Sequence, residues 1–366
     1  MSTLRIAVLL VVCMFGNVQA EGEVSVGAYL SMTGASATFG VSAQQGIQLA
    51  IDQYNAKAKV KVKLETVDTQ GKQSEAAAAV TRLADHGVVA VIGEVASSVS
   101  LAGAPIAQQR GLPMITPAAT HPKVTDVGDL IFRACQTDDA QAKVMARFAR
   151  TLKIGRIAIL SDQTQAYSTG LAAAFETAFK AQGGSIAATQ TYSPGDDFES
   201  QLRAIGAAKV QWVFVPGFYT DVAAAAKRAQ QLGIRVTFLG GDGWDSDELG
   251  KLAGTALDGS YYTNHFAVDD TRAAARAFVK AYTARYKQAP DTLAALGYDA
   301  ANVVLGAIAK AKSTSGSDLA TAIRATKLGG ATGELAFHAK DQGITKPMVV
   351  LKISSGKPRF AASVTP

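Results

Sequence analysis

The chain has 366 residues, of which 48% are hydrophobic and 18% charged, and its formal net charge is +6. This length is too great for one ordinary hydrophobic core and predicts two domains. The 36 lysines and arginines are dispersed and form no basic patch interleaved with aromatic residues, which argues against a nucleic-acid-binding protein.

The first twenty residues have the pattern of a secretory signal peptide. Arg5 precedes an apolar stretch over 6–15, and Val18-Gln19-Ala20 is a cleavage signal with small residues at both ends. A membrane anchor is the alternative, but a spanning helix needs about 20 apolar residues and this stretch is shorter. We therefore expect residues 1–20 to be removed and the mature chain to be periplasmic.

The first half of the remaining chain alternates predicted strands and helices. Val60-Lys61-Val62-Lys63-Leu64 alternates lysine with apolar residues, which predicts a strand with one wet face at a sheet edge. Ser74 is the expected cap of the next helix, and Gly87 is its expected end. The predicted elements are a strand over 24–30, a helix over 40–55, a strand ending near Asp68, a helix over 74–87 and a strand over 88–92.

Residues 91–122 carry two hydroxyl-bearing turns, each placed after a predicted strand. Ser97 and Ser98 are expected at the N-cap of a helix that ends before Gly111, and 112–115 is the next predicted strand. Ligands bind outside the carboxyl ends of strands in open α/β sheets. Free N–H groups at a helix start, together with serine and threonine hydroxyls, are suited to a small carboxylate.

One cysteine, Cys135, follows the predicted signal peptide, so we expect no internal disulfide and a buried, unreactive thiol. The four histidines are scattered without metal-ligand spacing, and no phosphate-binding glycine-rich loop follows the first strand. These observations predict no metal, no cofactor and no catalysis.

The same strand and helix alternation restarts at Arg156, which predicts an α/β fold of two doubly wound lobes. The last hundred residues are less regular, and we expect a hairpin-type end there but no segment able to cross a membrane. The predicted elements are strands over 156–160, 210–215 and 236–239, helices over 170–182, 221–232, 271–286 and 297–310, and hairpin strands over 337–343 and 348–356.

Several motifs, in this order and spacing, resemble the leucine/isoleucine/valine-binding family of periplasmic solute-binding proteins. They are 27–34 (GAYLSMTG), 46–51 (GIQLAI), 93–98 (GEVASS), 116–120 (TPAAT), 216–219 (PGFY), 240–245 (GGDGWD) and 297–302 (GYDAAN). The resemblance implies two Rossmann-like lobes joined by a hinge of three crossings, with the ligand in the cleft between them. It also implies that residues 21–137 and 268–344 form one lobe and that 138–267 and 345–366 form the other.

The resemblance further implies a set of ligand-binding residues. Ser97 matches a serine that holds the ligand carboxylate, and Ala118 and Thr120 match positions that bind the carboxylate and ammonium. Asp242 matches an acidic residue that faces the ammonium. Tyr167 matches a tyrosine of the opposing lobe, and Phe39 and Phe218 match aromatic residues of the side-chain pocket.

The resemblance therefore predicts a monomeric receptor that captures leucine, isoleucine or valine and delivers it to an ABC permease in the inner membrane. The first alternative keeps the fold but binds an aromatic acid, an amide or a urea-like solute. The second is a periplasmic sensor of the same fold. An enzyme lacks a recognisable catalytic constellation, and a DNA-binding repressor lacks an N-terminal helix pair.

Overall fold

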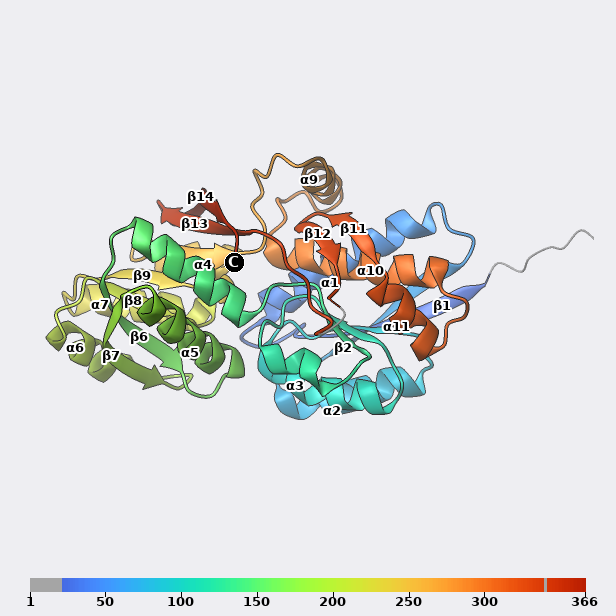
Figure 1. Cartoon of the computed structure of the whole chain (residues 1–366), viewed down its shortest axis with the longest axis horizontal. Helices are drawn as coiled ribbons and strands as arrows, with labels where there is room; N and C mark the ends of the chain where they lie inside the picture. Colours follow the sequence, from blue (N-terminus) through green and yellow to red (C-terminus); the bar gives the residue numbers. More distant parts are fainter. Residues whose placement is uncertain (1–21, 339–340) are drawn as a thin grey trace, which may run out of the picture.

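A computed structural model describes residues 22–338 and 341–366 of the chain. The predicted signal peptide, residues 1–20, lies outside the described residues. Figure 1 shows two α/β lobes side by side, each with a central sheet covered by helices. We call the lobe with the N-terminal strands the first lobe, and the other the second lobe.

The first lobe is built on a parallel sheet with the strand order β2-β1-β3-β4-β5. Its strands are β1 (Glu23–Leu30), β2 (Lys61–Asp68), β3 (Val91–Gly93), β4 (Met114–Thr116) and β5 (Ile131–Arg133). The lysine-rich strand β2 lies at the edge of this sheet, as its alternating pattern predicts. An edge position leaves the backbone groups along one side of β2 unpaired, and on its faces Val62 is buried while Lys63 is exposed.

Helices cover both faces of the first sheet, with α2 and α3 below and α1 and α10 above in the view of Figure 1, and α11 packs against α10. The helices of this lobe are α1 (Ala37–Asn55), α2 (Gln73–Asp85), α3 (Ser97–Gln109), α9 (Ala273–Tyr286), α10 (Thr292–Lys310) and α11 (Gly316–Arg324), with the short helix η1 (Pro122–Val127). A small hairpin, β11 (Lys327–Gly330) and β12 (Gly333–Ala336), completes it.

Helices α1 and α10 approach closely because glycines face the partner backbone. A Cβ added at Gly46 would lie 1.9 Å from the carbonyl oxygen of Ala294, and one at Gly297 would lie 2.4 Å from that of Ala43. Both distances are far below van der Waals contact, so neither position accommodates a side chain. The pair places the first turn of α10 against the end of the first sheet.

The second lobe has a sheet with the strand order β14-β13-β10-β9-β8-β6-β7. Its strands are β6 (Arg156–Asp162), β7 (Ser185–Tyr192), β8 (Trp212–Val215), β9 (Thr237–Gly240), β10 (Tyr261–Asn264), β13 (Met348–Ser354) and β14 (Lys357–Val364). The helices are α4 (Asp138–Thr151), α5 (Ala166–Ala181), α6 (Glu199–Ala207), α7 (Tyr219–Gln231) and α8 (Asp247–Ala253), with the short helix η2 (Asp242–Trp244).

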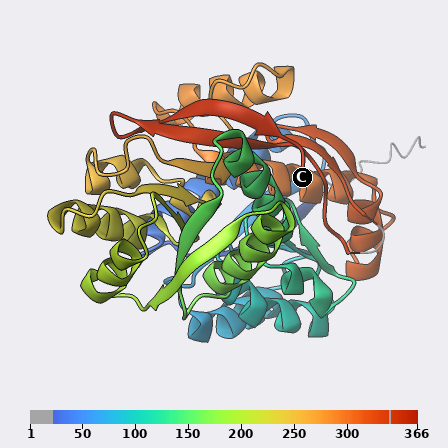
Figure 2. The same cartoon turned by 60° about the vertical axis from the view of Figure 1, so that its left-hand side comes forward.

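The central strands of this sheet are buried on both faces. In β6, Ile157 and Ile159 pack with α4 and α5, whereas Ala158 and Leu160 pack with the opposite layer of α6 and α7. This explains why β6 is a continuous apolar run rather than an alternating one. Figure 2 shows the hairpin β13–β14 along one edge of the lobe.

The chain passes between the lobes after β5, after β10 and before β13. We call these segments the first, second and third crossings. We propose that the chain leaves one lobe for the other between residues 137 and 138, between 267 and 268, and between 344 and 345.

Several local predictions were wrong by one or a few residues. The N-cap of α3 is Ala96, so Ser97 and Ser98 are its first two helical residues. The N-cap position of α2 is Lys72 rather than Ser74, and no side chain makes a capping hydrogen bond there. The C-terminal hairpin joins β13 to β14 instead of 337–343 to 348–356, because β13 finds its partner later in the chain.

Helix α10 corrects another expectation. Among the described residues it is the one helix long and apolar enough to cross a membrane by length and composition. However, 72% of its apolar window is buried inside the protein. Its hydrophobicity is that of a core helix, which contacts α1 and α11.

Candidate ligand-binding cleft

The carboxyl ends of the parallel strands in both lobes face one cleft. Strands β3 and β4 lead into the serine and threonine loops, whereas β6, β8 and β9 lead to Tyr167, Phe218 and Asp242. The cleft lining is Phe39, Val95, Ala96, Ser97, Ala118, Tyr167, Phe218, Asp242, Gly243, Thr292, Leu293 and Leu296. Six of the seven predicted residues thus converge here from separate elements.

The cavity in this cleft measures about 30 Å³, enough for one or two water molecules. The lobes are therefore nearly closed on each other. An organic ligand enters such a site only after the lobes separate at the hinge.

The loop that carries Ser97 is anchored by a buried carboxylate below it. Glu94 accepts hydrogen bonds from Ser31 Oγ at 2.5 Å and from the Ala96 backbone N–H at 2.6 Å. Its backbone carbonyl accepts from Thr116 Oγ1 at 2.6 Å. Burial raises the pKa of Glu94. Glu94 thereby ties the two hydroxyl-bearing loops together and aims the start of α3 into the cleft.

Ser97 is buried, and its Oγ accepts a hydrogen bond from the His121 backbone N–H at 3.2 Å. Because the first N–H groups of a helix have no intrahelical partner, the start of α3 presents donors to the cleft. Thr120 is not among the residues that line the cavity. Its buried side chain lies beside the carboxyl group of Asp138.

Aromatic rings form the apolar side of the cleft. Tyr167 and Phe218 stack with ring centroids 5.5 Å apart, and Phe39 of the first lobe meets Phe218 edge-on at 5.7 Å. The hydroxyl of Tyr167 accepts a hydrogen bond from the Gly243 backbone N–H at 3.0 Å. Tyr167 therefore also supports the loop that carries Asp242.

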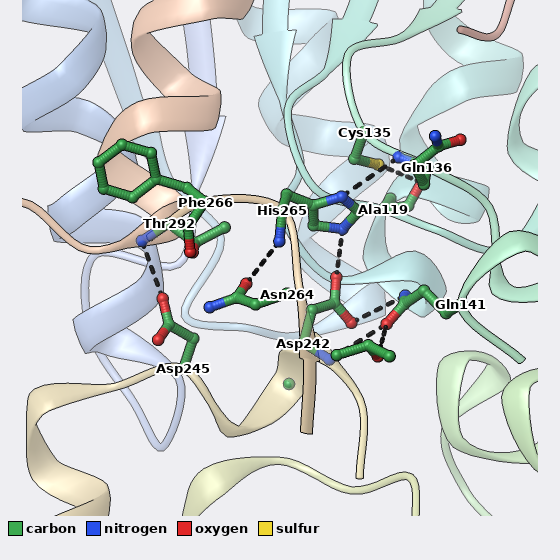
Figure 3. Close-up of polar contacts among 12 residues, drawn as sticks. Ala119, Cys135, Gln136, Gln141, Asp242, Asp245, Asn264, His265, Phe266 and Thr292 are labelled. Atoms are coloured by element: carbon green, nitrogen blue, oxygen red, sulfur yellow. Dashed lines mark hydrogen bonds and ion pairs between the residues drawn. The ribbon is translucent and has the colours of Figure 1, made fainter. Parts of the chain in front are cut away.

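Asp242 is the acidic group of the cleft, and its side chain is 11% exposed. Gln141 Nε2 donates to its Oδ1 and His265 Nε2 lies against its Oδ2, each at 3.0 Å (Figure 3). A carboxylate has about four lone-pair positions. Asp242 therefore keeps acceptor capacity toward the cleft after both contacts are made.

Sequence reasoning missed several functional candidates. Thr292, Leu293 and Leu296 belong to the first turns of α10, whose start was predicted at Gly297. The Asp291-Thr292 pair before an apolar run is a helix-start signal that would have included them. Gln141 and His265 carry no local signal, because their role depends on contacts with residues 101 and 23 positions away.

Hydrogen bonds across the cleft hold the lobes in this closed arrangement. The hydroxyl of Tyr219 donates to the Ala35 carbonyl at 2.9 Å, and the Ala166 N–H donates to Ser98 Oγ at 2.9 Å. Asp245 accepts from the Thr292 N–H at 2.8 Å. These bonds join residues of the two lobes and are lost when the lobes separate.

Replacing Tyr219 by phenylalanine should weaken ligand binding by a few fold. The change removes one neutral hydrogen bond of the closed form, worth about 0.5–1.5 kcal/mol. Calorimetric titration of the ligand identified by screening checks this. Tyr261→Phe is the matched control because its hydroxyl makes no hydrogen bond within the described part of the chain. Equal affinities of Tyr219→Phe and the unmodified protein would show that this contact does not stabilise closure.

The buried carboxyl group of Asp138 should make the folded protein less stable as pH rises. This carboxyl group is buried, and the Thr120 hydroxyl lies beside it as a hydrogen-bonding neighbour. Burial raises its pKa from 3.8 to about 8. Between these two pH values the folded protein holds a proton that the unfolded chain releases, so this group makes stability fall as pH rises.

The variant Asp138→Asn removes this titration. Relative to the unmodified protein, its melting temperature should rise more at pH 8 than at pH 5, measured by calorimetry without ligand. Asp139→Asn is the control, since Asp139 is the exposed neighbour in the same helix turn. A difference in melting temperature that is independent of pH would contradict the raised pKa of Asp138.

Comparisons with known proteins agree with this architecture. A family model described as periplasmic binding protein matches residues 23–358. A leucine-, isoleucine-, valine-, threonine- and alanine-binding protein of Pseudomonas aeruginosa is 30% identical, and the match covers 84% of each chain.

Two solved structures are also similar. The leucine-binding protein LivK of Thermotoga maritima is 35% identical with a TM-score of 0.89, and the match covers 94% of this chain and 99% of LivK. A solute-binding protein of an ABC transporter from R. palustris, solved with benzoate, is 22% identical with a TM-score of 0.84 over 94% of this chain and 97% of its own. At that identity the second likeness concerns the fold alone.

Proposed function

The chain belongs to the periplasmic binding protein family, and we propose that it captures an aliphatic amino acid, leucine, isoleucine or valine, in the cleft between its lobes. In this proposal it acts without catalysis as a periplasmic monomer and delivers the amino acid to an ABC permease of the inner membrane. The observation that carries the proposal is the pairing of a helix start with a buried acid across one apolar cavity.

A zwitterion needs donors at one end and a negative acceptor at the other. The first turn of α3 with Ser97 supplies donors for a carboxylate, and the Ala118 carbonyl and Asp242 supply acceptors for an ammonium. Charge-assisted hydrogen bonds then offset the loss of water on closure.

The remaining lining suits an aliphatic side chain. Phe39, Phe218, Leu293 and Leu296 enclose the cavity with apolar surface. Burial of a leucine-sized side chain contributes about 1.5–3 kcal/mol. Because one methylene discriminates by only about 1–3 kcal/mol, we expect leucine, isoleucine and valine all to bind. The P. aeruginosa and LivK likenesses support the same ligand class.

A thermal-shift screen of the refolded, ligand-free protein tests the proposal. The panel contains the standard amino acids and small aromatic acids. A ligand at about 100 times its Kd stabilises by about 2.7 kcal/mol, which raises the melting temperature measurably. Shifts with leucine, isoleucine and valine support the proposal, whereas shifts confined to aromatic acids contradict the proposed cargo.

A second candidate cargo is an aromatic acid. The stacked rings of Tyr167 and Phe218, with Phe39 edge-on, form a surface on which a further ring could pack. Such a ligand has a carboxylate for α3 but no ammonium for Asp242. Asp242→Ala would then leave binding unchanged, which separates the two candidates.

A further inference from the structure

One hydrogen-bonded chain joins Asp242 to all three crossings of the hinge. His265 belongs to the second crossing, directly after β10, and its Nε2 lies 3.0 Å from Asp242 Oδ2. The Gln136 backbone N–H of the first crossing points to His265 Nδ1 at 3.5 Å, a long hydrogen bond. The side-chain amide of Gln136 donates to the Lys346 carbonyl of the third crossing. Figure 3 shows the first two of these contacts.

The two contacts of the His265 ring determine which ring nitrogen carries its proton. Since Nδ1 faces an N–H donor, it serves as an acceptor, and the single ring proton sits on Nε2, where it is donated to Asp242. An imidazolium would set an N–H at Nδ1 against the N–H of Gln136. The neutral ring is the form that satisfies both partners, and its side chain is fully enclosed, with 0% exposed.

The charged groups around the ring agree with this geometry. Asp242 and Asp245 come from the loop after β9, and Lys346 comes from the third crossing. Burial lowers the pKa of His265, Asp242 opposes that shift, and Lys346 reinforces it. Burial also lowers the pKa of Lys346 to about 8, while its Nζ donates to the Ala134 carbonyl at 3.2 Å and to Thr332.

We propose that His265 is a positioning residue that holds the Asp242 carboxylate toward the cleft through a neutral Nε2–H and ties its orientation to the hinge. The amine-binding part of this inference rests on the proposed function. Gln141 holds the other oxygen of Asp242 from α4, so the carboxylate is fixed at both ends. A carboxylate fixed before the ligand arrives loses little conformational freedom on binding.

The test compares two substitutions of the same residue by calorimetric titration with L-leucine. His265→Leu removes the donor at similar volume, and we expect affinity to fall at least tenfold. His265→Gln supplies an amide N–H to Asp242 Oδ2, and we expect affinity within about threefold of the unmodified protein. His86→Leu is the control, because His86 is exposed and pairs with Glu65 at the surface.

A purely structural role would make both His265 variants bind equally weakly, and that result overturns the inference. Unchanged leucine affinity in His265→Leu also overturns it. Melting temperatures of the ligand-free variants show whether each one is folded before titration.

Nitrogen-15 NMR of the ligand-free, histidine-labelled protein provides a readout that needs no ligand. We expect His265 to show a protonated Nε2 and an unprotonated Nδ1 at pH 7. An imidazolium or the opposite tautomer overturns the inference whatever the cargo is. If the protein binds aromatic acids alone, the proposed function fails, and the nitrogen signals still decide whether His265 donates to Asp242.

Discussion

Replacing Asp242 by alanine should reduce the affinity for leucine by about 30-fold to several thousand-fold. Loss of one partner from a buried, charged hydrogen-bonded pair costs about 2–5 kcal/mol, which corresponds to this range. The reason is that the ligand ammonium would lose its anionic acceptor inside a closed cavity, where water does not replace it. Calorimetric titration measures the affinity directly.

Two controls make this result specific. Asp247→Ala removes an exposed acid five residues away and should leave the affinity unchanged. The α-hydroxy analogue of leucine lacks the ammonium. The unmodified protein should therefore bind leucine more tightly than this analogue, and Asp242→Ala should reduce the ratio of the two affinities. If the variant keeps both its leucine affinity and its preference, Asp242 does not bind the ammonium.

A large effect on stability is expected at Gly297. Gly297→Ala would place a methyl group 2.4 Å from the Ala43 carbonyl oxygen, so α10 must move away from α1. Overpacking of this kind costs about 1–3 kcal/mol, and the approach to a rigid backbone atom places Gly297 at the upper end. The melting temperature, followed by calorimetry, should fall by several degrees.

Gly306 provides the matched control because it lies in the same helix. A Cβ there would meet nothing within 4 Å among the described residues. Gly306→Ala should raise stability by about 0.5–1 kcal/mol, since alanine has the better helix propensity. If both variants lost stability, α10 would be sensitive to any glycine substitution and not to the close contact at Gly297 in particular. If neither variant lost stability, the close packing of α1 on α10 would be contradicted.

Much of the cleft was predictable because its residues follow strands. Ser97, Ala118, Phe218 and Asp242 each come shortly after a predicted strand, and carboxyl ends of parallel strands share one edge. The family resemblance then selected residues within those loops. Thr120 was placed in the cleft by the same reasoning, yet it is not among the lining residues, because a loop's local turn decides which side chain faces the cavity.

The sequence by itself determined the α/β class, the two-lobe organisation and the edge position of β2, because hydrophobic periodicity and turn residues act locally. Only the tertiary structure decided that Gln136, His265 and Lys346 meet beside Asp242. Gln136 contacts residues 129 and 210 positions away, and no local pattern encodes which crossings of a hinge become neighbours. Such contacts arise where the three crossings run side by side between the lobes, so they depend on the packing of the whole chain.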